Sequence, residues 1–101
     1  MKGLTVLLVD DEPLMRLSMM DALEAVGCEV QAASTGTEGI EAIRAKTYDV
    51  VITDLRLPGV DGLTVLQTAK GKESQTEVLV ITAHGSVETA VEAMKLGAFD
   101  Y

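Results

Sequence analysis

Short apolar runs alternate with longer segments of helical spacing along the whole chain. The run that ends at Asp54 is the most apolar, because three consecutive β-branched residues precede Thr53 and a Pro58-Gly59 turn signal follows. Runs of this kind are typical of strands buried on both faces of a parallel sheet. The pattern predicts strands at residues 4–9, 28–33, 50–54 and 77–81, and the beginning of a fifth at residue 98.

The first helical segment has an unusually broad apolar face. Pro13 fits the first position of a helix and Gly27 supplies its stop. A face of this width predicts that the helix packs against another helix as well as against the sheet. The face consists of Met15, Met19, Ala22, Leu23 and Val26, widened by Leu14, Leu17 and Met20.

Three more helical segments follow. One comes after a turn at residues 34–37 and places Ile40, Ala42 and Ile43 toward the core. Another has Asp61 as its N-cap and Gly71 as its end, with an inner face of Leu63, Leu66 and Ala69. The last runs from about Val87 to Leu96 after a Ser86 cap, with Val87, Ala90, Val91 and Met94 facing inward.

Strict alternation of strand and helix with short connections predicts right-handed parallel crossovers. The expected fold class is therefore α/β, with a doubly wound parallel sheet. In such a sheet the carboxyl ends of neighbouring strands meet at one edge, where ligands bind.

Composition limits the possible functions. The chain has 101 residues, 48% of them hydrophobic, which suits one packed domain. A formal charge of −8 repels nucleic acid phosphates, so we expect no direct nucleic acid contact by this segment. The single cysteine, Cys28, and the lack of a long apolar run or signal-peptide layout predict a cytoplasmic protein with no membrane contact.

Oxygen-bearing side chains follow three of the predicted strands. Asp10 and Asp11 follow the first, Asp54 ends the third and Thr82 follows the fourth. Taken singly, these are ordinary helix-start, turn or strand-end residues. Their convergence on one edge favours a functional site, and carboxylates without His or Cys favour a small hard cation such as Mg²⁺. Asp54 is then the natural nucleophile toward phosphorus, and the Thr82 hydroxyl could bond the transferred group.

Other phosphate sites fit less well. The sequence has neither the G-x-G-x-x-G of dinucleotide folds nor the G-x-x-x-x-G-K-[ST] of P-loops. Phosphatases of the haloacid-dehalogenase type need a second aspartate two positions after the nucleophile, where this chain has Arg56. A Mg²⁺-dependent phosphohydrolase with Asp54 as nucleophile stays open as the enzyme alternative.

Four motifs resemble the receiver domains of bacterial two-component response regulators. They are Val9-Asp10-Asp11-Glu12-Pro13, residues 53–62 around Asp54, Ile81-Thr82-Ala83-His84-Gly85 and Gly97-Ala98-Phe99-Asp100-Tyr101. The resemblance covers the entire chain. Residues 85–101 look most like receivers of the NtrC type, which precede an ATPase module and a DNA-binding module in sigma-54-dependent activators.

The resemblance implies a signalling switch and not an enzyme. Asp54 would take a phosphoryl group from a sensor histidine kinase, and Mg²⁺ would be held by Asp10, Asp11, Asp54 and the backbone carbonyl of Arg56. Thr82 and Tyr101 would then move as the switch between inactive and active forms. Self-phosphorylation and slow self-dephosphorylation are the only turnover expected, and a pseudo-receiver that switches without phosphate stays open.

The resemblance also implies a flavodoxin-like sheet of five strands in the order 2-1-3-4-5. Residues 1–101 would form one receiver domain that is truncated in the fifth strand. The family's lysine after the position of Tyr101 and its last helix would be missing. The uncovered apolar surface would favour self-association as a homodimer, and His84 is expected to be a loop residue beside the site.

Overall fold

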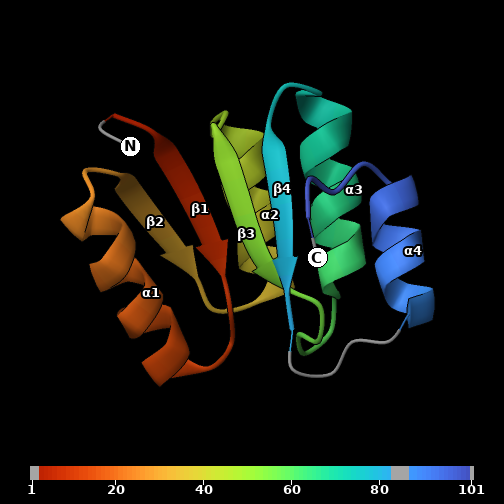
Figure 1. The fold of residues 1–101 in the computed structure, drawn as a ribbon, viewed down its shortest axis with the longest axis horizontal. Helices are drawn as coiled ribbons and strands as arrows, with labels where there is room; N and C mark the ends of the chain where they lie inside the picture. The colour runs from red at the N-terminus through yellow and green to blue at the C-terminus, as the bar shows by residue number, and fades with distance from the viewer. Residues whose placement is uncertain (1–2, 83–86, 101) are drawn as a thin grey trace.

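The computed structural model describes residues 3–82 and 87–100, which form one parallel sheet and four helices (Figure 1). The strands are β1 (Thr5–Val9), β2 (Glu29–Ala33), β3 (Val50–Asp54) and β4 (Glu77–Ile81). The helices are α1 (Pro13–Ala25), α2 (Gly36–Ala45), α3 (Gly62–Lys72) and α4 (Val87–Lys95).

The predicted fold class is confirmed. All three strand pairings are parallel, and the order is β2-β1-β3-β4, as the resemblance implied for the first four strands. The segment after α4 begins to extend the sheet beyond β4. The backbone N–H of Phe99 donates to the carbonyl of Val78 at 2.7 Å, and that of Val80 donates to Asp100 at 3.0 Å.

The sheet has a different cover on each face. Alternate strand residues such as Leu7, Val9 and Val51 form the larger core, against which α2, α3 and α4 pack. The opposite face carries Val6, Leu8 and Ile52, which pack against α1. Because successive strand residues point to opposite faces, the continuous apolar runs in the sequence supply both cores.

The broad apolar face of α1 is covered by the sheet on one side only. Met19, Met20 and Leu23 pack against the sheet, but Leu14 and Leu17 are 76% and 57% exposed. Among residues 3–82 and 87–100 no helix packs closely on α1. Apolar periodicity reports where a helix could bury surface, and it cannot report whether a neighbour is there.

The inner face predicted for α4 is wrong for its three larger residues. Val87, Val91 and Met94 are exposed and Ala90 is half-buried, whereas Ala93 is fully buried and Leu96 packs on the larger core. A small side chain lets the helix approach the domain closely, so the larger apolar residues of α4 remain on its outer surface. The predicted Ser86 cap lies outside the described residues.

Several helix ends follow the sequence signals. Asp61 caps α3 and Thr35 caps α2, each accepting a hydrogen bond from a backbone N–H three residues later. The expectation that Gly71 ends α3 is wrong, since the helix continues to Lys72. In the part of the chain that the structure describes, no helix is long and apolar enough to span a bilayer.

Candidate functional site

All four strands point the same way, so their carboxyl ends lie on one side of the sheet (Figure 1). The acidic residues meet at these carboxyl ends. Asp54 is the last residue of β3, and its register partner in β4 is Ile81. Asp10 directly follows β1, whose Val9 pairs with Thr53. Parallel pairing in register therefore brings three strand ends level with one another.

The carboxylates of Asp10, Asp11 and Asp54 lie close together. Each offers an oxygen within 4.8 Å of the other two. Asp10 is buried, Asp54 is half-buried and Asp11 is exposed. They open into a cleft of about 430 Å³, which is also lined by Glu12, Met15, Arg56, Ile81 and Thr82.

Burial and the neighbouring carboxylates both raise the pKa of Asp10. Removal of the carboxyl group from water raises the pKa of Asp10 above its ordinary 3.8, and the carboxylates of Asp54 and Asp11 raise it further. A hydrogen bond from the Glu12 backbone N–H and the charge of Arg16 oppose that rise. The site is therefore an electrostatically strained cluster whose negative charges a cation would relieve.

Short loops hold two of the aspartates. The Asp10 Oδ1 accepts a hydrogen bond from the backbone N–H of Glu12 at 2.9 Å, and the Asp54 Oδ1 accepts one from that of Arg56 at 3.3 Å. Glu12 itself caps α1 by accepting from the N–H of Leu14 at 3.2 Å. The helix-start interpretation of these acids thus fits Glu12.

Glycine allows the loop after β3 to fold back closely on the phosphoacceptor candidate. The Gly62 N–H donates to the carbonyl of Leu55 at 2.9 Å, and a Cβ on Gly62 would lie 2.1 Å from the backbone oxygen of Asp54. A Cβ on Gly36 would lie 2.2 Å from the backbone oxygen of Val60 in the same loop. The first residues of α2 and α3 therefore fix the course of this loop.

The structure brings together five of the six residues predicted from the sequence. Asp10, Asp11, Asp54, Arg56 and Thr82 line one cleft. Tyr101 and His84 lie outside the described residues.

Sequence reasoning missed three residues around this cleft, namely Met15, Arg16 and Gly62. Met15 lines the cleft, Arg16 donates to the backbone of Asp10, and Gly62 packs on Asp54. A cation in the first turns of a helix, next to three acids, was the available signal for Arg16.

The donor set fits a hard cation. Asp10, Asp11 and Asp54 could supply carboxylate oxygens, and no His or Cys is among the described residues that line the cleft. Oxygen-only sites favour Mg²⁺ or Ca²⁺ over zinc. Chemically, the arrangement offers a half-buried carboxylate beside clustered acids and a hydroxyl.

A doubly wound α/β domain with clustered carboxylates at the carboxyl ends of its strands is the class that this fold and site define. The sequence profile of the response regulator receiver domain matches residues 6–101, and the chain belongs to this family. The resemblance drawn from the four motifs is thereby confirmed.

Named relatives agree with this family. The chain is 38% identical over 96 residues to the DNA-binding transcriptional regulator NtrC of Escherichia coli K12, covering 95% of this chain and 20% of that protein. The chain thus spans about a fifth of the length of this relative.

Solved structures share the fold. A response regulator receiver domain protein from Clostridium thermocellum is 36% identical, with a TM-score of 0.89 over 97% of this chain and 79% of that one. A response regulator from Burkholderia pseudomallei with a phosphorylated aspartic acid, a calcium ion and citrate is 27% identical. Its TM-score is 0.92 over 98% of this chain and 58% of that one.

Proposed function

We propose that this receiver domain is a phosphoacceptor in which Asp54 takes a phosphoryl group from a sensor histidine kinase. The observation that carries the proposal is the convergence of Asp10, Asp11, Asp54 and Thr82 on one cleft. The phosphorylated aspartic acid in the Burkholderia regulator supports it, because that protein has the same fold.

The proposed chemistry is a transfer from nitrogen to oxygen. A carboxylate oxygen of Asp54 attacks the phosphorus, a P–O bond forms and the P–N bond to the kinase imidazole breaks. The electron pair stays on the imidazole nitrogen. The product at Asp54 is an acyl phosphate, and the Thr82 hydroxyl donates a hydrogen bond to one of its oxygens.

Asp10, Asp11, Asp54 and the backbone carbonyl of Arg56 would hold Mg²⁺ in this site. When bound, the cation supplies positive charge that offsets the negative charge of the transferred group. The strained carboxylate cluster and its oxygen-only donors support this assignment. The protein's own contribution is to orient Asp54 and to hold three like charges together before the reaction.

The proposed output is a population shift involving Thr82 and Tyr101. The similarity to NtrC supports a role in transcription activation, with ATPase and DNA-binding modules elsewhere in a longer cytoplasmic protein. The exposed apolar residues Leu14, Leu17 and Val87 support contacts with such modules or with a second copy.

Phosphorylation with acetyl phosphate and Mg²⁺ tests this function. We expect a mass increase of one phosphoryl group that an Asp54→Asn variant does not show and that excess EDTA prevents. An Asp61→Asn variant is the matched control, since Asp61 lies in the following loop and caps α3. Labelling that persists in Asp54→Asn would refute Asp54 as the acceptor.

The same samples discriminate the two remaining alternatives. Sustained hydrolysis of a phosphate ester, dependent on Asp54, would identify a phosphohydrolase. Absence of both labelling and Mg²⁺ binding would favour a receiver that switches without phosphate.

A further inference from the structure

Arg16 lies beside the acidic cleft and is bonded to the turn that precedes its own helix. Its Nη1 donates a hydrogen bond of 2.8 Å to the backbone carbonyl of Asp10. The guanidinium also interacts electrostatically with the carboxylates of Asp10 and Glu38. Arg16 is half-buried, so these interactions are partly shielded from water.

The bonded carbonyl belongs to the turn that aims the acidic side chains. Asp10 has left β1 and its own N–H still donates to Ala33 of β2 at 3.1 Å, whereas α1 begins at Pro13. The Arg16 bond holds the carbonyl on the other side of the same residue. Together the two bonds fix the point at which the chain turns from strand to helix.

Two electrostatic effects disfavour the positive charge of Arg16 at this position. Arg16 is the fourth residue of α1, and a helix dipole disfavours positive charge near its N-terminus. Its charge also repels any cation in the adjacent cleft. A side chain that stays there despite both effects is held by the carbonyl that it bonds and is attracted by the Asp10 and Glu38 carboxylates.

The partner on α2 is itself fixed. Glu38 Oε1 accepts hydrogen bonds from the backbone N–H and the hydroxyl of Ser34, at 2.8 and 2.9 Å. Its own N–H donates to the Thr35 hydroxyl at 3.1 Å. The Glu38 carboxylate that attracts Arg16 is therefore held in place by Ser34, just before α2.

We infer that Arg16 is a positioning residue of the acidic site, which holds the turn at Asp10 so that Asp10 and Asp11 converge on Asp54. The inference rests on the proposed Mg²⁺ function of that site. Two effects of Arg16 on cation affinity oppose each other, because its charge repels the ion while its hydrogen bond orders the ligands. Groups that orient metal ligands typically change affinity by 10- to 100-fold, so we expect ordering to dominate.

Titration with Mg²⁺, followed by calorimetry, tests the inference in the full chain. Arg16→Met keeps an unbranched, flexible side chain and removes its donors and charge, and we expect about 10- to 100-fold weaker Mg²⁺ binding. Arg16→Lys keeps a charge and a donor and is expected to restore part of the affinity. Arg44→Met makes the same change on the exposed end of α2 and should leave the affinity within about twofold, since distant surface charges are screened.

The outcomes are separable. Unchanged or tighter Mg²⁺ binding in Arg16→Met would show that the ordering effect of Arg16 does not dominate, which overturns the inference. If that variant does not fold, Arg16→Ala, which also removes both the charge and the donors, carries the same expectation and the same refutation. Asp11→Asn reports on the proposed function itself, because equal Mg²⁺ binding by wild type and Asp11→Asn would refute the metal site regardless of Arg16.

Discussion

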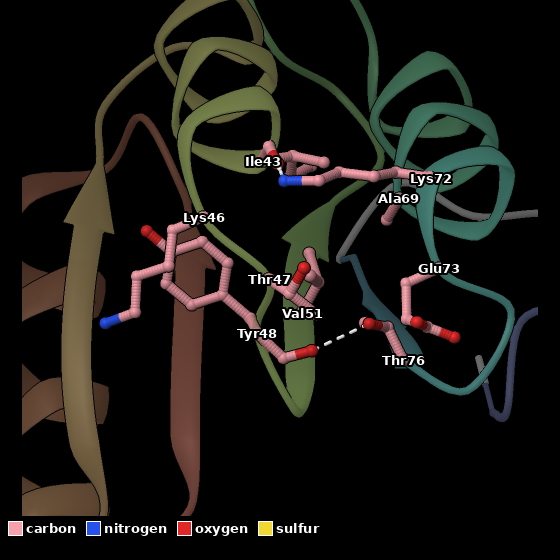
Figure 2. A pocket seen from close by; sticks show the side chains of 9 residues that line it. All are labelled: Ile43, Lys46, Thr47, Tyr48, Val51, Ala69, Lys72, Glu73 and Thr76. Carbon is pink, nitrogen blue, oxygen red and sulfur yellow. Dashed lines mark hydrogen bonds between the residues drawn. The ribbon is translucent and has the colours of Figure 1, made fainter.

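The two ends of the sheet handle polar groups in opposite ways. At the amino end, the space between α2, α3 and the strands is only about 10 Å³, and the side chains of Thr76 and Lys72 bond to backbone carbonyls there (Figure 2). A hollow of about 380 Å³ lies farther along this end, beside β2. At the carboxyl end, three carboxylates face a cleft of about 430 Å³. The region between α2, α3 and the strands, which we call the filled end, stabilises the fold. The open end holds carboxylates whose mutual repulsion a bound cation would relieve.

The polar side chains at the filled end have hydrogen-bond partners. The Thr76 hydroxyl donates to the carbonyl of Tyr48 at 2.7 Å, as Figure 2 shows. The Tyr48 hydroxyl donates to Gln31 Oε1, and burial raises the pKa of Tyr48. Lys72 donates to the carbonyls of Ile43 and Arg44 at the end of α2. Cations at a helix C-terminus are favourable, in contrast to Arg16 at the start of α1.

The largest effect is expected from Gly62→Ala, which would break the close packing at the open end. A Cβ there meets the backbone of Asp54 and Leu55 at 2.1 and 2.8 Å, and neither atom can move without displacing β3. We expect a loss of about 1–3 kcal/mol or more in the free energy of unfolding, together with weaker Mg²⁺ binding. Urea unfolding and Mg²⁺ titration measure the two effects.

Gly71→Ala is the matched control, because Gly71 lies in the same helix and a Cβ there would have nothing within 4 Å. Alanine should stabilise α3 there by roughly 0.5–1 kcal/mol. Equal effects of the two substitutions would contradict the close-packing argument.

Thr76→Val tests the filled end. The substitution keeps the side-chain volume and leaves the carbonyl of Tyr48 without its hydroxyl partner, so we expect a loss of about 1–3 kcal/mol in stability. Mg²⁺ affinity should not change, because Thr76 is at the opposite end of the sheet. Thr68→Val is the control, since its hydroxyl donates only to the carbonyl of Thr64 one helical turn away. A change of Mg²⁺ affinity in Thr76→Val would break the separation of the two ends.

The same contrast explains what the sequence could predict. The bounds of β4 and the convergence of Asp10, Asp54 and Thr82 follow from local patterns combined with the rules of parallel sheets. The burial of Ala93 in place of Met94 does not, because both residues fit an amphipathic helix and only tertiary packing chooses between them.

The contacts that shape the site are likewise nonlocal. The close contacts of Gly62 with Asp54 and of Gly36 with Val60 depend on how the loop after β3 folds back. Residue spacing in the sequence does not predict that course. The hydrogen bond of Arg16 requires the particular turn between β1 and α1. Such contacts need coordinates, whereas the candidate ligands themselves could be predicted from residue type and position.

Asp10→Asn tests the repulsion between Asp10 and the carboxylates of Asp11 and Asp54. The pKa of Asp10 is raised chiefly by burial, so the folded state holds its proton more tightly than the unfolded state does. Its contribution to stability is therefore present at low pH and is lost as the pH rises from about 3.8 through the folded pKa.

At neutral pH and without metal, Asp10→Asn should accordingly stabilise the protein, by less than about 1 kcal/mol because water screens part of the repulsion. With saturating Mg²⁺ the order should reverse, since the wild type gains more from binding. Thermal unfolding with and without Mg²⁺ measures both. A variant less stable than wild type in EDTA would show that Asp10 is not under repulsion.

The smallest change in stability is expected for a substitution of Glu38. This carboxylate lies at the open end, and its ionised form is stabilised there. Hydrogen bonds from the backbone and side chain of Ser34 lower the pKa of Glu38 below its ordinary 4.5. The sign is opposite to that of Asp10: the contribution is present above about 4.5 and is lost as the pH falls through the folded pKa. Glu38→Gln should therefore reduce stability slightly near neutral pH, and its difference from wild type should shrink in acid.

Urea unfolding at neutral pH and at a pH below about 4 measures this difference. Glu41→Gln, on an exposed position of the same helix, makes the same change of charge away from the cap and is the control. A difference between wild type and Glu38→Gln that is the same at both pH values would mean that the lost hydrogen bonds do not depend on the ionised carboxylate. The hydrogen bonds from Ser34 would then not explain why the pKa of Glu38 is lowered while that of Asp10, at the same end of the sheet, is raised.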